Sequence, residues 1–391
     1  MGRRDSSVIG HPRRSGRRWS RVRTGVALAA LSLVATACGP TDLWGWGFNA
    51  NAELGDGTTG QRNEPVALDN QREWRTVAAG SAHTVAVDTQ GRLWAWGDNS
   101  YGELGTGDTD DRSIPTQVGT DADWRTVTAG YAFTVAIKHD GTLWAWGLNG
   151  IGRLGDGTAT DRLVPTRIGS DADWLLVVAG ESHTLASKVD GSLWTWGWNV
   201  YGQLGTGDTA SRNVPTLVAS DLWSITAGYA HSIAVRGDGT LWAWGMNDQG
   251  QVGDGTTTNR LEPTLVSDEP GWRSVVAGRF HNVALRTDGS LRTWGDGESG
   301  ALGNSAVDDV LAPAAVPADG TWRAVGAGSY HSMAVRSDGT LWGWGSNWTG
   351  QLGDGTTQDH PVPTQIGSST DWQTLHGGGG RTLALRAEPP G

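Results

Sequence analysis

Five histidines are the side chains in this chain whose type and spacing are best suited to chemistry. Each follows an Ala-Gly-x-x stretch, and histidines at a regular spacing could bind a metal ion or transfer protons. However, each belongs to a separate copy of a repeat, and Phe133 and Arg381 occupy the same position in two further copies. We therefore predict that these residues form structural hydrogen bonds and do not bind a metal. They are His83, His183, His231, His281 and His331.

A recurrent Gly-Asp-Gly loop, found at Asp56, Asp156, Asp254 and Asp354, has some similarity to a calcium-binding loop. It lacks the regular run of acidic ligands and the terminal Glu that calcium sites use, so we expect a turn and no metal or cofactor. Catalysis needs one asymmetric set of reactive groups, and every histidine motif here is repeated. The sequence thus favours a protein that is not an enzyme, with a hydrolase or lyase site in a central channel as an alternative.

The elements that must position these residues repeat every 50 residues, apart from one interval of 48. Units of this length that bury an apolar face by stacking on their neighbours form solenoids or propellers, and short apolar runs separated by turns indicate strands. We predict an all-β propeller. The phrase Leu-Trp-x-Trp-Gly that marks the repeat begins at Leu43, Leu93, Leu143, Leu193, Leu241 and Leu341, with a degraded copy at Leu291.

Each unit reads as four antiparallel strands. Asp-Gly between the second and third strands, as in Asp140-Gly141, predicts a tight hairpin with a primed turn. A proline such as Pro115 is expected to open the fourth strand, and because proline lacks a backbone donor, that strand should form the outer edge of its blade. The recurrent tryptophans, 20 of the 23 in the chain, are interpreted as packing between blades.

Counting the repeats predicts how the ring closes. Six complete units begin at Trp74, Trp124, Trp174, Trp223, Trp272 and Trp322. Residues 43–68 supply the third and fourth strands of another unit, and residues 372–385 supply its first and second strands. Pairing these two halves makes a seventh blade and leaves no exposed sheet edge at the junction. The propeller is therefore predicted to span residues 43–387, with a C-terminal tail at 388–391.

The repeated residues resemble a known family. The pattern Ala-Gly-x-x-His-[Ser/Thr]-x-Ala, followed by Asp-Gly-[Thr/Ser]-Leu-Trp-x-Trp-Gly-x-Asn-x-x-Gly-[Gln/Glu]-Leu-Gly, is similar to the regulator of chromosome condensation repeat and covers roughly residues 42–386. The resemblance implies a seven-bladed propeller. It also implies two different activities, because eukaryotic members promote nucleotide exchange on a small GTPase and contact chromatin, whereas a secreted bacterial relative inhibits β-lactamases.

The N-terminus favours an exported protein. Eight arginines between residues 3 and 23 precede an apolar stretch at 25–37, as in a bacterial export signal, which we place at residues 1–37. Cys38 is the only cysteine and follows a sequence that resembles a lipoprotein box, so a lipid on Cys38 is expected to anchor the domain through a linker at 38–42. Free secretion is the alternative, and the export route is left open.

Charge restricts the partners. Of 30 basic and 41 acidic residues, the predicted signal contains eight and one, so 22 basic and 40 acidic residues remain and the net charge is about −18. Such a surface is unsuited to nucleic acid, and an anionic membrane would hold it only through the lipid. We expect a monomer outside the cytoplasmic membrane.

Aromatic residues in the variable loops are the candidate site. Equivalent loops of a ring share one face, and Tyr and Trp are enriched at protein-binding hot spots. We predict that this face binds a protein partner, such as a secreted or cell-wall enzyme. Packing against neighbouring blades, carbohydrate binding and nucleotide exchange are the alternatives. The predicted residues are Tyr101, Tyr131, Glu181, Trp198, Tyr201, Tyr229, Arg279, Phe280, Tyr330 and Trp348.

Overall fold

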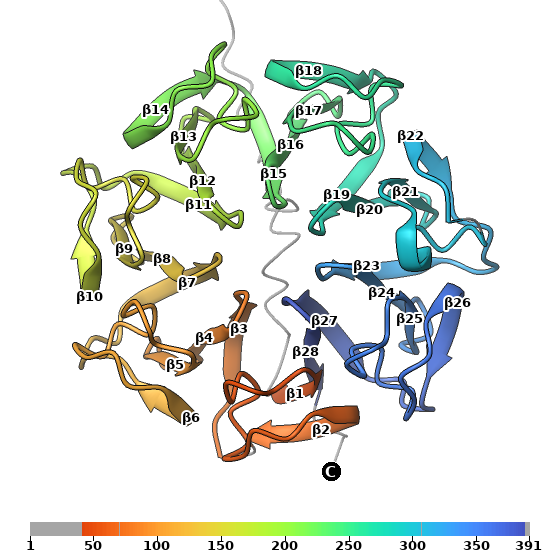
Figure 1. Ribbon diagram of the computed structural model, residues 1–391, viewed down its shortest axis with the longest axis horizontal. Helices are drawn as coiled ribbons and strands as arrows, with labels where there is room; N and C mark the ends of the chain where they lie inside the picture. The colour runs from red at the N-terminus through yellow and green to blue at the C-terminus, as the bar shows by residue number, and fades with distance from the viewer. Residues whose placement is uncertain (1–40, 70, 306, 388–391) are drawn as a thin grey trace, which may run out of the picture.

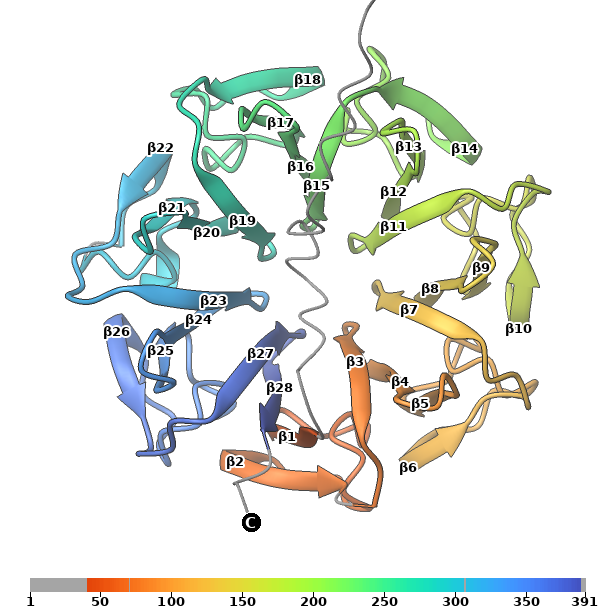
Figure 2. The same ribbon diagram turned by 180° about the vertical axis from the view of Figure 1, so that it is seen from behind.

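The computed structural model describes residues 41–69, 71–305 and 307–387, and this part of the chain forms seven four-stranded antiparallel sheets around a central axis (Figures 1 and 2). Each sheet is one blade, and its first strand lies nearest the axis (Figure 1). The predicted seven-bladed propeller is confirmed. The export signal, Cys38 and the tail at 388–391 lie outside the described residues.

The strands follow the repeat. The first blade contains β3 (Trp74–Ala79), β4 (His83–Asp88), β5 (Leu93–Gly97) and β6 (Arg112–Gln117). The second contains β7 (Trp124–Ala129), β8 (Phe133–Lys138), β9 (Leu143–Gly147) and β10 (Arg162–Arg167). The third contains β11 (Trp174–Ala179), β12 (His183–Lys188), β13 (Leu193–Gly197) and β14 (Arg212–Ala219). The fourth contains β15 (Leu222–Ala227), β16 (His231–Arg236), β17 (Leu241–Gly245) and β18 (Arg260–Ser267).

The remaining three blades include the one that closes the ring. The fifth contains β19 (Trp272–Ala277), β20 (His281–Arg286), β21 (Leu291–Gly295), a short 3₁₀ turn η1 (Glu298–Gly300) and β22 (Val310–Ala315). The sixth contains β23 (Trp322–Ala327), β24 (His331–Arg336), β25 (Leu341–Gly345) and β26 (His360–Ile366). The seventh contains β27 (Trp372–Gly377), β28 (Arg381–Ala387), β1 (Thr41–Gly47) and β2 (Arg62–Asp69).

The seventh blade joins the two halves of the chain as predicted. Its strand order is β2-β1-β28-β27, and β1 pairs with β28 in an unbroken register from Thr41 opposite Ala387 to Gly47 opposite Arg381. The two middle strands of this sheet therefore come from opposite ends of the described chain. The ring is held closed by backbone hydrogen bonds between them.

The hairpin between the second and third strands exists, but its turn differs from the prediction. In the second blade the N–H of Gly141 donates to the carbonyl of Lys138, and the N–H of Lys138 donates to the carbonyl of Thr142. Three residues thus form the loop, and only Gly141 has a positive φ, of 80°. This is a type I turn followed by a left-handed glycine. The Asp140 side chain accepts hydrogen bonds from Thr142 and stabilises the turn.

The fourth strand lies at the outer edge of each blade, which confirms that prediction. It begins earlier than predicted, because β6 starts at Arg112 and Pro115 lies within the strand. The pairing of β5 with β6 is irregular between Ala95 and Gly97, so the ladder bends where proline cannot donate. The proline therefore lies inside an edge strand and does not open it.

Tryptophans fill the interior within and between blades. Trp74 of β3 packs edge-on against Trp94 and at a tilted angle against Trp96 of the third strand, with ring centroids 6.3 and 5.9 Å apart. The indole Nε1 of Trp96 also donates to the carbonyl of Glu53 in the seventh blade, at 2.9 Å. The interpretation of these residues as packing between blades is confirmed. Aromatic pairs of this geometry add roughly 0.5–1.5 kcal/mol each to the energy of burial.

A second repeated feature escaped the sequence analysis. Near the end of the second strand a cation lies against the tryptophans of its own blade; Lys138 Nζ is 4.8 Å from the ring centre of Trp124 and 4.9 Å from that of Trp144. Lys138 also pairs with Asp121 and Asp123, at 2.5 and 3.0 Å. Equivalent cations contact tryptophan rings in five other blades: Lys188, Arg236, Arg286, Arg336 and Arg386.

No helix in the described ranges is long and apolar enough to cross a membrane.

Candidate functional site

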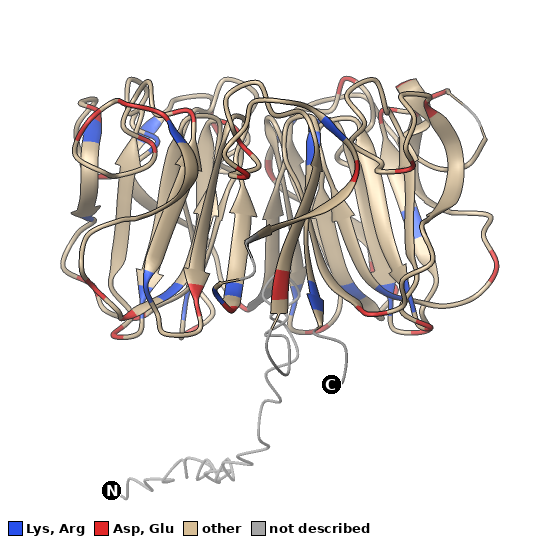
Figure 3. Ribbon diagram, turned by 90° about the horizontal axis from the view of Figure 1, so that it is seen from below, with Lys and Arg blue, Asp and Glu red and all other residues tan. Residues whose placement is uncertain are grey.

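The two ends of the ring differ in their connections. One end, which we call the loop end, carries the loops between the first and second strands and between the third and fourth strands of each blade. The opposite end, the turn end, carries the Asp-Gly hairpins and the connections from blade to blade. Charged residues gather at both ends, and the strands between them are largely uncharged (Figure 3). Thr41 and Ala387, the ends of the described chain, pair with each other at the turn end.

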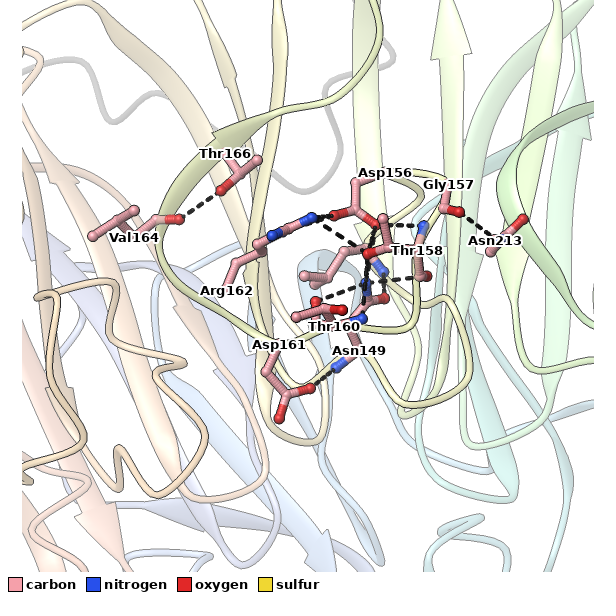
Figure 4. Close-up of polar contacts among 11 residues, drawn as sticks. Asn149, Asp156, Gly157, Thr158, Thr160, Asp161, Arg162, Val164, Thr166 and Asn213 are labelled. Carbon is pink, nitrogen blue, oxygen red and sulfur yellow. Dashed lines mark hydrogen bonds and ion pairs between the residues drawn. The ribbon is translucent and has the colours of Figure 1, made fainter.

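In six of the seven blades a buried asparagine holds the loop between the third and fourth strands, and in the fifth blade Gly297 takes its place. In the second blade, Asn149 Nδ2 donates to the carbonyls of Thr158 and Thr160, and Asn149 Oδ1 accepts the N–H of Leu154 (Figure 4). Asp156 of the Gly-Asp-Gly loop accepts from Arg162 at 2.8 Å. The Asp-containing loop is a turn, as predicted, and the described residues contain no group of three or more metal-ligating side chains.

The loops between first and second strands are linked to one another around the axis. The N–H of Tyr131 donates to the carbonyl of Glu181, and that of Tyr229 to the carbonyl of Arg279, each at 3.1 Å. Glycine allows this close approach, since a Cβ on Gly180 would lie 2.7 Å from the carbonyl oxygen of Gly228. Side chains on these loops therefore start from a fixed backbone.

The recurrent histidines lie beneath these loops and are structural, as predicted. His83 Nε2 is 3.0 Å from Thr134 Oγ1 of the next blade, and His231 Nε2 is 2.8 Å from Asn282 Oδ1. Burial lowers the pKa of His83 to about 3 and that of His231 to about 4, so both are neutral at pH 7. The three other histidines form equivalent bonds: His183 with Ser232, His281 with Ser332 and His331 with Thr382.

The structure brings five of the predicted aromatic residues into one continuous row, which we call the aromatic arc: Trp198, Tyr201, Tyr229, Phe280 and Tyr330. Consecutive rings contact each other at 5.4, 5.8, 5.3 and 6.3 Å between centroids, in the order Tyr201–Trp198–Tyr229–Phe280–Tyr330. The arc crosses the third, fourth, fifth and sixth blades. All five side chains remain partly accessible, so the arc contributes both to packing and to the surface.

Arg279 and Glu181 fix the middle of the arc. The Arg279 guanidinium lies 5.1 Å from the ring centre of Tyr229 and 5.3 Å from that of Phe280, and it donates to the hydroxyl of Tyr330 at 3.1 Å. It also pairs with Glu181 across the ring at 3.3 Å. Burial raises the pKa of the Glu181 carboxyl, and the charge of Arg279 opposes that shift.

The three other predicted residues lie at the loop end but outside the arc. Tyr101 and Tyr131 are 42% and 50% exposed, and Trp348 is 68% exposed, which makes it the most accessible large aromatic side chain among the described residues. None of them makes a ring contact with another described aromatic side chain. The structure thus divides the predicted set into a packed arc and three accessible side chains.

The axis contains a cavity of about 180 Å³ lined by small and apolar residues of the first strands. His376 is the titratable residue in this lining, and burial lowers its pKa to about 4. Arg279, Glu181 and Tyr229 contribute to the mouth of the channel at the loop end. The channel opens beneath the aromatic arc.

Family models of known proteins match the repeated part of the chain. Residues 21–275 match the family model described as the RCC1-like domain. The chain belongs to this family. Residues 288–335 and 338–385 match a model of the regulator of chromosome condensation (RCC1) repeat, so the RCC1-like signature continues through the last blades. No curated protein sequence matches the chain.

Solved structures show the same RCC1-like fold at low sequence identity. Yeast RCC1 (Prp20), crystallised with Kap60, is 21% identical with a TM-score of 0.84, covering 98% of this chain and 97% of that one. Saccharomyces cerevisiae Prp20p, described with its binding properties to Gsp1p and histones, is 23% identical with a TM-score of 0.83, covering 93% and 95%. Human WBSCR16 is 20% identical with a TM-score of 0.80, covering 89% and 99%.

The sequence analysis missed Arg153, which lies in the loop between β9 and β10. Its position holds Gln in three other repeats, at 203, 251 and 351, and Glu in two, at 53 and 103. Arg153 is 7% exposed, and its Nε is buried without a hydrogen-bond partner. The signal was present in the sequence as one cation at a position otherwise occupied by amide, carboxylate or methyl side chains.

Proposed function

We propose that this RCC1-like propeller is an exported protein-binding domain whose loop end captures a secreted or cell-wall enzyme of the β-lactamase or penicillin-binding type. The observation that supports it best is the aromatic arc. Its five rings come from four repeats, are absent from the corresponding positions of most other copies, and remain partly exposed on a hydrogen-bonded backbone. Rigid, partly exposed Tyr and Trp side chains supply large contact area at a low cost in conformational entropy.

The position of the chain ends supports the same function. Thr41 lies at the turn end, only three positions after Cys38 in the sequence. A lipid on Cys38 would therefore attach the ring by its turn end, and the loop end would face away from the membrane. A partner moving outside the cytoplasmic membrane would then meet the aromatic arc first.

The test is direct inhibition. Residues 39–391 would be mixed with purified serine β-lactamases and penicillin-binding proteins, and both hydrolysis of a chromogenic cephalosporin and binding would be measured. We expect inhibition at near-stoichiometric concentrations by the native domain. The double variant Tyr229→Ala/Phe280→Ala should bind at least about 100-fold more weakly, because hot-spot side chains contribute roughly 2 kcal/mol or more each.

A matched control lies at the turn end. Val189 is 67% exposed in a hairpin of the third blade, so Val189→Ala should bind like the native domain. Equal loss in both variants, or no binding by any enzyme of these two classes, would contradict the proposal. Release of a labelled guanine nucleotide from a small GTPase would instead support the exchange activity that the family resemblance implies.

A further inference from the structure

Arg153 is a buried arginine without a partner. Its guanidinium forms no hydrogen bond and no ion pair with any described residue. The guanidinium carbon lies 5.9 Å from the centre of the Phe133 ring. Its side chain is more than nine-tenths buried. Buried charges are ordinarily paired, because a desolvated donor without an acceptor is costly. The Nε–H of Arg153 is therefore buried without an acceptor, and no described group accepts a hydrogen bond from the rest of its guanidinium.

Equivalent residues in other repeats serve the loop in a way that Arg153 does not. In five repeats the side-chain oxygen accepts the N–H two residues earlier, at 2.7–3.0 Å, as Glu103 does for Tyr101 and Gln203 for Tyr201. Arginine has no acceptor, so Arg153 cannot do this for Ile151. Arg153 therefore leaves the Ile151 N–H without this bond. Its own guanidinium donors gain no acceptor in exchange.

A hydrogen bond between two blades is also missing at Arg153. In six blades the inner tryptophan of the third strand donates to a carbonyl of the preceding blade, as Trp146 does to Glu103 at 2.9 Å. Trp196 should donate to the carbonyl of Arg153, but its Nε1 is buried without a partner. The Arg153 carbonyl keeps only the bond from Thr184, whereas the equivalent Glu103 carbonyl accepts from both Thr134 and Trp146. The loop around Arg153 is thus less well satisfied than its counterparts.

The surroundings of Arg153 suit an anionic group. Phe133, beneath the guanidinium, replaces the histidine found in five other repeats. Tyr101 and Tyr131 are near enough that their hydroxyls act on the charge of Arg153, and both are half exposed at the loop end. Asp161, the acidic group whose charge acts on Arg153, accepts the N–H of Asn149 at 2.6 Å and forms no ion pair with Arg153. An arginine that lies on an aromatic ring can still bind a planar carboxylate through two parallel hydrogen bonds.

We propose that Arg153, with Tyr101 and Tyr131, forms a pocket for a carboxylate of the protein partner. The inference rests on the proposed protein-binding function and specifies it further, since it assigns an acidic side chain or a C-terminal carboxylate of the partner to one place on the loop end. The site is separate from the aromatic arc, because Arg153, Tyr101 and Tyr131 belong to the first and second blades and the arc belongs to the third to sixth. The partner would thus be held by apolar contacts at the arc and by one charged contact at Arg153.

The test uses three short blocked peptides and no partner protein. Acetyl-Gly-Glu-Gly-amide presents a side-chain carboxylate, acetyl-Gly-Gly-Gly presents a terminal carboxylate, and acetyl-Gly-Gln-Gly-amide is the neutral control. Binding to residues 39–391 would be followed by ligand-observed NMR at constant ionic strength. We expect at least one acidic peptide to bind with a dissociation constant on the order of 1 mM, and the stronger one to identify the source of the carboxylate.

Variants separate recognition from structure. Arg153→Gln introduces the residue found at the same position in three other repeats, so the fold should be kept and Tm should not fall. It should weaken acidic-peptide binding by about tenfold or more, and Arg153→Lys should weaken it less. Arg167→Gln, which changes an exposed arginine at the end of β10 in the same blade, should leave the binding unchanged. Equal binding of the neutral peptide, equal binding by Arg153→Gln, or no acidic-peptide binding at about 10 mM would overturn the pocket. Enzyme capture by the aromatic arc would stand in each of these cases.

Discussion

The turn end and the loop end are built from the same repeat but use it differently. At the turn end, Lys138 and Lys188 occupy one position, contact the same pair of tryptophans in their own blades and bind two aspartates each. At the loop end, Tyr229 and Phe280 occupy positions that hold Ser81 or Glu181 and Ala82 or Ser182 in other blades. Residues that repeat pair with their neighbours and maintain the ring. The aromatic residues of the arc that do not repeat remain partly exposed and are the candidates for function.

The strongest test of this contrast removes the closure of the ring. A chain ending at residue 371 lacks β27 and β28, so β1 loses its central partner and the first and sixth blades lose a neighbour. We expect loss of the cooperative thermal transition, measured by circular dichroism. A circular permutant, with the ends at the turn end joined by a flexible linker and the chain opened after Gly119, should keep Tm within about 5 °C. Cooperative melting of the truncated chain would show that six blades suffice.

The second largest effect is expected from acid, which should lower the stability of the propeller. Burial lowers the pKa of His83, His183 and His331 to about 3 and that of His231 and His281 to about 4. Below the ordinary pKa of 6.5 the unfolded chain binds protons that the folded chain excludes, so stability falls as pH decreases from about 6.5 towards 4. Each histidine contributes on the order of 1.4 kcal/mol per pH unit in this window. Denaturant unfolding at several pH values measures the slope.

Phe133 provides the matched control for the acid effect. Because a phenylalanine is accommodated at this position in the second blade, His83→Phe should fold and should reduce the pH dependence. Glu103 has the opposite effect on the pH dependence of stability. Burial raises its pKa to about 7, so its contribution to the free energy of unfolding decreases as pH rises from about 4.5 to 7. An unchanged slope in His83→Phe would mean that the histidines are not the source.

The cation at the turn end should affect stability and not binding. Lys138→Ala removes two contacts with tryptophan rings and leaves Asp121 and Asp123 unpaired, which should lower the free energy of unfolding by about 1–3 kcal/mol. Enzyme inhibition by the folded variant should equal that of the native domain. A large loss of inhibition would contradict the assignment of function to the loop end.

The smallest effect on stability is expected at the accessible aromatics. Trp348 makes no ring contact in the described structure and is 68% exposed, so Trp348→Ala should change the free energy of unfolding by no more than about 0.5 kcal/mol. Thermal melts check this value. A loss above about 2 kcal/mol would mean that this side chain packs, and that exposure does not separate binding from structural residues at the loop end.

The fold could be predicted almost entirely from the sequence, because every repeat carries the same pattern of strands and turns. Six copies of the Leu-Trp-x-Trp phrase and one degraded copy predicted the blades, and the half-units at residues 43–68 and 372–385 predicted the closure. The errors were local: Pro115 lies within its strand, and Asp140-Gly141 belongs to a three-residue loop. Both depend on backbone conformation over three or four residues, which residue type restricts but does not determine.

The candidate site was predictable only as a set of positions. Loop equivalence placed all ten residues at one end, but Trp198 joins Tyr229 through contact between blades, and the single sequence carries no sign that Trp348 lacks such a neighbour. Arg153 could not be predicted from the loop aromatics, because it is not aromatic and it occurs at its position in one repeat. Its signal is a departure from a repeated Gln or Glu whose structural role became visible only with the hydrogen bonds.

The pairing of β1 with β28 also sets the order of events during synthesis. β1 is the first described strand to leave the ribosome, and its partner is the last. Until β28 is made, β1 lacks its neighbour in the middle of the seventh blade and the ring is not closed. Completion of the fold is thus tied to release of the whole chain, and a protein crossing a membrane in unfolded form would close its ring only after its last strand had arrived on the far side.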